Sequence, residues 1–210
     1  MVPLTRCLTP WIVALALTLG ACGSAPPAER DRFFRLDLPA PVATPGAPVR
    51  ATLVVNDLRA GGFEGGQRIV YRTAGEPLQV YRYPTLWWEE PPGRALAGRL
   101  AEALRAAGLV DVVVRPDQRV RGDYLLGGEL IRFEHRPTDQ PPRVVVDFTL
   151  TLVRASDRRA LLSRPYRGEE PVPETSPEAM AAAFNRLTAR LVATAVDDLV
   201  GLKPRLRGAQ

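Results

Sequence analysis

Cysteine, histidine and lysine are the scarcest reactive side chains in this sequence. Its 210 residues include two cysteines, Cys7 and Cys22, one histidine, His135, and one lysine, Lys203. A single histidine rules out a histidine-rich metal cluster, and no serine lies in a G-x-S-x-G turn. We therefore expect no enzyme activity, no metal and no other cofactor, although the many carboxylates leave a glycosidase open. His135 ends a predicted strand, which favours a place at the surface or a sheet edge.

Long hydrophobic runs are also missing. The longest apolar stretch covers residues 11–21, whereas a membrane-spanning helix needs about 20 residues. Together with the positive charge of Arg6, this stretch is typical of a signal peptide, which we place at residues 1–21. No later run approaches spanning length, so we expect the remaining chain to be tethered rather than embedded.

Small residues precede the second cysteine in Leu19-Gly20-Ala21-Cys22. This pattern resembles the lipobox, which implies cleavage before Cys22 and acylation of its thiol; an ordinary signal peptide with a chance cysteine is the alternative. Buried acyl chains contribute about 0.8 kcal/mol per CH₂, so several chains anchor a protein firmly. Gly23 rather than Asp follows the cysteine, and by similarity to enteric sorting this favours the outer over the inner membrane. Because Cys7 leaves with the signal, we expect no internal disulfide.

The chain after the signal divides into three parts. Residues 22–50 form the lipidated N-terminus, a Pro- and Ala-rich spacer and a short edge strand at residues 33–38. Residues 51–203 form one domain, and residues 204–210 form a basic tail. The net charge of the whole chain, +5, suits anionic headgroups or an acidic partner, but an arginine-rich genomic composition explains it equally well. No nucleic-acid recognition motif is present, so we expect no nucleic-acid partner.

Hydrophobic periodicity predicts an α+β fold, with a mostly antiparallel sheet and two amphipathic helices packed on it. One helix begins at Pro91-Pro92 and ends at Gly108; the other begins at Ser176 and ends at Gly201 and Pro204. The glycine-rich segment 61–66 lacks the lysine of a phosphate-binding loop and is interpreted as a mobile connector. Predicted strands cover residues 51–58, 68–72, 78–83, 109–114, 123–135, 143–154 and 160–170.

Four aromatic residues are candidates for contact with a partner or a lipid: Tyr71, Tyr83, Trp87 and Trp88. Tyrosine and tryptophan combine a large apolar area with a polar group, which suits both interfaces and cores. Core packing and partner contact therefore both stay open. Two adjacent tryptophans on an extended segment point to opposite sides, so we expect one to be buried and the other accessible.

Several short motifs occur in a distinctive order. They are Phe33-Phe34-Arg35-Leu36, Arg68-Ile69-Val70-Tyr71-Arg72, Tyr81-Arg82-Tyr83, Trp87-Trp88-Glu89-Glu90-Pro91-Pro92 and Tyr166-x-Gly168-x-Glu170 followed by Pro173. With the lipobox, this order resembles the auxiliary lipoprotein family of ABC-type transporters over roughly residues 22–200. Phe34 stands where tyrosine is usual in that family. The Pro- and Ala-rich insertion and the long glycine loop are local departures from it.

The resemblance implies a periplasmic component of an intermembrane lipid transport system. Its partners would be a mammalian-cell-entry domain protein and the associated permease and ATPase, with phospholipid as a further candidate ligand. The lipoprotein would dock the transport tunnel at the outer membrane and help to maintain envelope integrity. The resemblance leaves self-association into a homo-oligomer open. A structural or assembly lipoprotein without a transport role is the alternative, and a hydrolase of envelope substrates is a third hypothesis.

Overall fold

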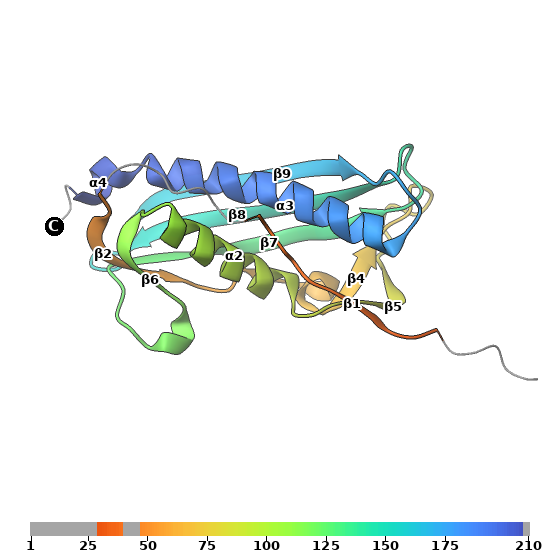
Figure 1. Ribbon diagram of the computed structural model, residues 1–210, viewed down its shortest axis with the longest axis horizontal. Coiled ribbons are helices and arrows are strands. Elements are labelled where there is room, and N and C mark those ends of the chain that lie inside the picture. Colours follow the sequence, from red (N-terminus) through yellow and green to blue (C-terminus); the bar gives the residue numbers. More distant parts are fainter. Residues whose placement is uncertain (1–28, 40–46, 208–210) are drawn as a thin grey trace, which may run out of the picture. The chain divides into compact units, whose positions relative to one another are not determined.

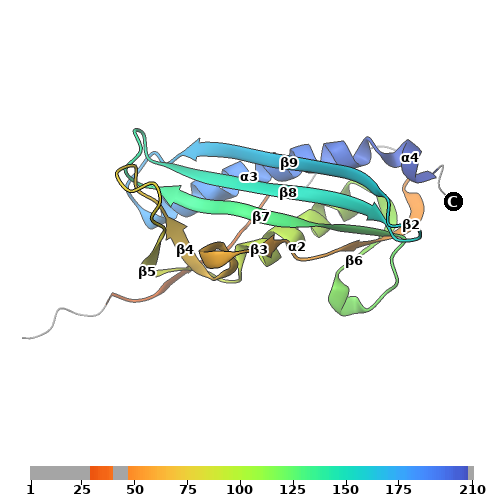
Figure 2. The ribbon, with the colours of Figure 1, turned by 180° about the vertical axis from the view of Figure 1, so that it is seen from behind.

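The longest strand, β7 (Tyr124–Arg136), lies at the centre of the sheet in the computed structural model, which describes residues 29–39 and 47–207. One edge of β7 pairs with β8 (Arg143–Arg154), and β8 pairs with β9 (Ala160–Pro171). Both pairings are antiparallel along nearly the full strand length, and Figure 2 shows the three strands side by side. These strands confirm the predicted meander, and because they contain most of the paired residues, the sheet is mostly antiparallel by residue.

Three short strands pair with the other edge of β7, and all three run parallel to it. They are β2 (Val49–Val55), β3 (Arg59–Ala60) and β4 (Arg68–Tyr71). This second set of pairings was not predicted, because no local pattern reports which distant strand lies alongside. The remaining pairings involve β1 (Arg32–Phe34), β5 (Tyr81–Trp88) and β6 (Val110–Val114). Of these, β6 pairs with β2, β5 pairs with β4, and β1 pairs with β5.

Two long helices, α2 (Pro92–Ala106) and α3 (Pro177–Val200), cover one face of this sheet (Figure 1). Ser176 caps α3, since its hydroxyl accepts a hydrogen bond from the Ala179 N–H at 3.1 Å, and Pro177 occupies the first helical position. Gly108 follows α2 with a φ of +57°, a backbone conformation that favours glycine. Both helices, the cap at Ser176 and the glycine at position 108 agree with the prediction from the sequence.

Shorter elements refine the prediction. The predicted strand 78–83 begins only at Tyr81 and then continues through Trp88, because residues 74–78 form turns and leave Leu78 94% exposed. The glycine-rich connector contains a 3₁₀ helix, η1 (Gly62–Gly65), and a second one, η2 (Pro116–Gln118), follows β6. The predicted basic tail begins within a short helix, α4 (Lys203–Arg207); its last three residues lie outside the described part.

The core lies between the sheet and the two long helices. Alternate residues of β8, from Val144 to Leu152, are buried against them, as the period of two predicts. An aromatic cluster fills the space under α3, where Phe133 stacks on Phe184 with ring centres 4.5 Å apart. The residues from Asp31 onward form one compact unit with this continuous core, which agrees with a single domain.

Candidate functional site

Three tyrosines from β4 and β5 form a continuous aromatic cluster near the start of α3. The ring of Tyr71 lies 5.2 Å from that of Tyr81 and 4.5 Å from that of Tyr83. Tyr71 and Tyr81 are directly paired across the antiparallel strands, so the register of the sheet brings the rings together. The structure thus joins two of the four candidate residues, Tyr71 and Tyr83, in one feature.

His135 completes this feature. The Tyr83 hydroxyl lies 2.8 Å from Nδ1 of His135, and the two residues are 52 positions apart in the sequence. Burial lowers the pKa of His135 to about 4, so its imidazole is neutral at pH 7. Burial also raises the pKa of Tyr83 to about 12, which keeps the phenol protonated. The pair is therefore neutral and hydrogen-bonded.

The predicted surface or sheet-edge position of His135 is wrong. The residue is only 9% exposed, and it lies within the sheet between Tyr71 of β4 and Val144 of β8. The prediction failed because it inferred exposure from the position of His135 at the end of a strand. The parallel pairing with β4 closes the second edge, and that pairing leaves no trace in the local sequence.

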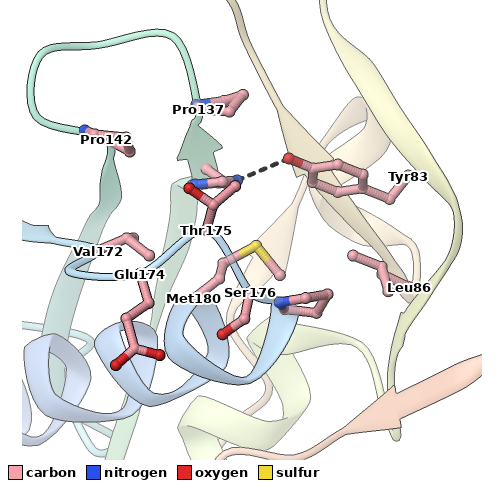
Figure 3. Close-up of a pocket in the computed structure, with 11 residues that line it drawn as sticks. Tyr83, Leu86, Pro137, Pro142, Val172, Glu174, Thr175, Ser176 and Met180 are labelled. Atoms are coloured by element: carbon pink, nitrogen blue, oxygen red, sulfur yellow. Dashed lines mark hydrogen bonds between the residues drawn. The ribbon is translucent and has the colours of Figure 1, made fainter.

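Beside the Tyr83–His135 pair lies a mostly apolar pocket of about 210 Å³. In Figure 3, Tyr83 and Leu86 of β5 lie across the pocket from Val172 and Glu174, which precede α3. Met180, from the first turn of α3, forms part of the wall between them. Sequence reasoning missed this pocket, since its walls come from separate segments spread between residues 83 and 180. The complete lining is Tyr83, Leu86, His135, Pro137, Pro142, Val172, Glu174, Thr175, Ser176, Pro177 and Met180.

The two adjacent tryptophans lie on different sides of β5. Trp88 is 2% exposed and contacts Phe133 and Phe184 edge-on, with ring centres 5.2 Å away in both cases. Trp87 is half-buried on the other side, stacked on Phe33 at 6.2 Å, with the Arg68 guanidinium 4.5 Å from its ring centre. Trp88 thus packs in the core, whereas Trp87 belongs to a surface cluster.

The sheet face away from the helices carries a buried carboxylate. Glu134 is fully buried, and it accepts hydrogen bonds from Arg72 Nε at 2.5 Å and from Arg136 Nη2 at 3.1 Å. A buried charge needs such partners, so we interpret this cluster as structural. Within residues 29–39 and 47–207, no group of three or more His, Cys, Asp or Glu side chains is arranged to hold a metal ion.

The predicted signal peptide and the predicted lipidation site, Cys22, lie outside the described residues. Among the helices of the described part, none combines the length and the apolar character needed to cross a membrane. The fold therefore defines a single-sheet α+β domain, with two amphipathic helices on one face and an apolar pocket at the start of the longer one.

This chain belongs to the family of ABC-type transport auxiliary lipoprotein components, whose family model matches residues 34–196. The match confirms the resemblance that the motif order indicated. A solved protein from Xanthomonas campestris is 23% identical, with a TM-score of 0.74 over 85% of this chain and 99% of the other. A second solved structure, of an uncharacterized protein, is 18% identical, with a TM-score of 0.63 over 81% of this chain and 99% of the other. At these identities the likeness shows the fold. A search of curated protein sequences finds no match.

Proposed function

We propose that this protein is a non-enzymatic adaptor of an intermembrane lipid transport system. Acyl chains on Cys22 anchor it in the outer membrane, and the folded domain docks the tunnel of a mammalian-cell-entry domain protein. Membership of the transport auxiliary lipoprotein family supports the general role. The motif order and Gly23 after the cysteine favour the particular system and membrane. An anchored adaptor acts by raising the local concentration of its partner, so it needs no chemistry of its own.

The observation that carries the docking proposal is the surface cluster of Phe33, Arg68 and Trp87, which we call the Trp87 cluster. Phe33 is 65% exposed and lies on β1, at one end of the strand order. Tryptophan and arginine, which stack here beside the exposed ring of Phe33, are among the residue types that dominate the binding energy of protein interfaces. A positively charged chain with such a cluster fits a partner surface that offers apolar area and carboxylates.

Co-purification from crosslinked cells tests this proposal. The wild-type protein should recover a mammalian-cell-entry domain protein together with its permease and ATPase, and Trp87→Ala should reduce that recovery at least about tenfold. Ile131→Ala serves as the control, because Ile131 is a large apolar residue that is 45% exposed outside the Trp87 cluster. Equal recovery with both variants would show that docking occurs elsewhere.

A structural or assembly lipoprotein is the competing function. It predicts recovery of an outer-membrane barrel or of peptidoglycan, with no mammalian-cell-entry domain protein in the same preparation. Separation of the two membranes on a density gradient tests the proposed location. Recovery of the acylated protein mainly in the inner-membrane fraction would contradict it.

A further inference from the structure

The pocket at the start of α3 contains a buried polar atom that has no partner. Nε2 of His135 is shielded from solvent and makes no hydrogen bond, whereas Nδ1 of the same ring contacts the Tyr83 hydroxyl. His135 is only 9% exposed and lines the pocket. Because unpaired buried polar groups are costly, this atom suggests that a ligand provides the missing partner.

The hydrogen-bond inventory determines which kind of partner is missing. If the Tyr83 hydroxyl donates to Nδ1, the neutral imidazole carries its proton on Nε2, and one donor is left unpaired. If Nδ1 donates instead, both the tyrosine proton and the Nε2 lone pair are left without partners. The first arrangement leaves fewer unmet groups. The unpaired group of His135, which lines the pocket, is therefore an N–H donor, and a ligand that pairs with it must supply an acceptor atom.

The remaining walls of the pocket are apolar and favour a hydrocarbon ligand. Leu86, Val172 and Met180 line the pocket together with three prolines. A dry cavity of about 150 Å³ accommodates benzene, so about 210 Å³ accommodates roughly eight carbons. This is enough for one segment of an acyl chain and too little for a whole phospholipid. An apolar side chain of a protein partner would fill the space but leave Nε2–H unpaired.

The charge at the rim of the pocket indicates which kind of oxygen acceptor the ligand carries. Glu174 lines the pocket and is exposed, so a carboxylate ligand would meet a like charge there. A neutral carbonyl oxygen satisfies the histidine donor without repulsion from Glu174.

We propose that this pocket binds an acyl-chain segment of an ester lipid. The ester carbonyl oxygen accepts the hydrogen bond from Nε2 of His135, and the chain packs against Leu86, Val172 and Met180. The inference deepens the proposed transport function and rests on it for the source of the lipid. Binding itself depends only on the pocket.

A matched pair of probes tests the two parts of this proposal. 1-Octanoylglycerol contains the ester carbonyl, and 1-octylglycerol has a chain of the same length but an ether in its place. Both are titrated by calorimetry into the chain from residue 22 onward with Cys22→Ser, so that no acyl chain of its own competes. The wild-type pocket should bind the ester about two- to tenfold more tightly than the ether. Because His135 is the only histidine, its imidazole nitrogen resonances report ligand contact directly.

Three variants separate the contributions. His135→Phe keeps an aromatic ring but removes the donor, so it should lower the ester affinity to that of the ether and leave the ether unchanged. Thr175→Trp places a bulky ring at the exposed rim and should weaken both probes, whereas Ala182→Trp, on the exposed side of α3, should weaken neither. Circular dichroism confirms that each variant is folded.

Equal affinity for ester and ether in the wild type would overturn the carbonyl assignment. Absence of binding heat and of any imidazole shift with both probes would overturn the pocket. Neither result bears on docking, because recovery of the mammalian-cell-entry protein is tested separately through the Trp87 cluster. Conversely, ester binding without partner recovery would uphold the pocket and reject the transport role.

Discussion

Trp87 and Trp88 are consecutive residues of β5, yet their rings lie on opposite sides of the sheet. Trp88 contacts Phe133 and Phe184 in the core, and Trp87 lies between Phe33 and Arg68 outside it. The pleat of a strand produces this alternation, and the helices on one face determine which ring is enclosed. Two tryptophans that are adjacent in the sequence therefore have different environments, one in the core and the other in a surface cluster.

The two tryptophans should respond differently to truncation. Trp88→Ala should lower the free energy of unfolding by about 3–5 kcal/mol, because it removes a buried aromatic side chain from a packed cluster. Trp87→Ala should cost no more than about 1 kcal/mol, since the ring is half-buried at the surface. Urea unfolding measures both. Similar losses for the two variants would contradict the assignment of Trp87 to a surface cluster.

Acid should destabilise the protein through His135. The pKa of His135 is about 4 in the fold, below the ordinary value of 6.5, because burial disfavours the charged ring. The unfolded chain therefore binds the proton first, and stability is lost as the pH falls from about 6.5 toward 4. The full shift corresponds to about 3 kcal/mol.

Carboxylates also titrate near the lower end of that range, so the test is a comparison. The free energy of unfolding is measured at several pH values for the wild type and for His135→Phe, in which this titration is absent. The wild type should lose more stability than the variant between pH 6.5 and pH 4.5. Parallel curves would show that the histidine titrates normally in the fold.

Two adjacent glycines of β7 should differ sharply in their tolerance of alanine. A Cβ at Gly128 would lie 1.8 Å from the backbone oxygen of Thr149 on β8, so the two strands would have to separate. Gly128→Ala should therefore cost about 3 kcal/mol or more. A Cβ at Gly127 would meet nothing closer than 3.8 Å, so Gly127→Ala is the matched control. A neutral Gly128→Ala, measured by thermal unfolding, would contradict the β7–β8 register.

Acylation at the predicted site can be measured directly. Radiolabelled palmitate should be incorporated into the wild-type protein and not into Cys22→Ser, since the thiol is the proposed attachment point. The Cys22→Ser variant should also be lost from the membrane fraction, because it lacks the anchoring acyl chains. A Cys22→Ser protein that is still labelled and processed normally would place the lipid elsewhere.

Much of the fold could be predicted because its signals are local. The cap at Ser176, the glycine at position 108 and the alternation in β8 each act within a few residues of the chain. The pairing of strands, in contrast, does not depend on such local signals. The parallel pairing of β4 with β7 joins residues more than 60 positions apart, and it decided that His135 is enclosed.

The candidate site was predicted in part. Tyr71 and Tyr83 were selected by residue type, but the contact between their rings depends on the β4–β5 register, and the contact between Tyr83 and His135 depends on β7 as well. The pocket adds Leu86, Val172 and Met180, which are ordinary apolar residues in the sequence. Nothing in their local pattern distinguishes them from other core positions.

By itself, the sequence predicted the export signal and the lipidation motif and indicated the two amphipathic helices and the family, because each depends on residues close together along the chain. Only the tertiary structure decided which tryptophan is enclosed, that the lone histidine is buried beside a tyrosine, and that a pocket opens at the start of α3. These features arise where distant strands and a helix meet, and the physical forces that join them act across space.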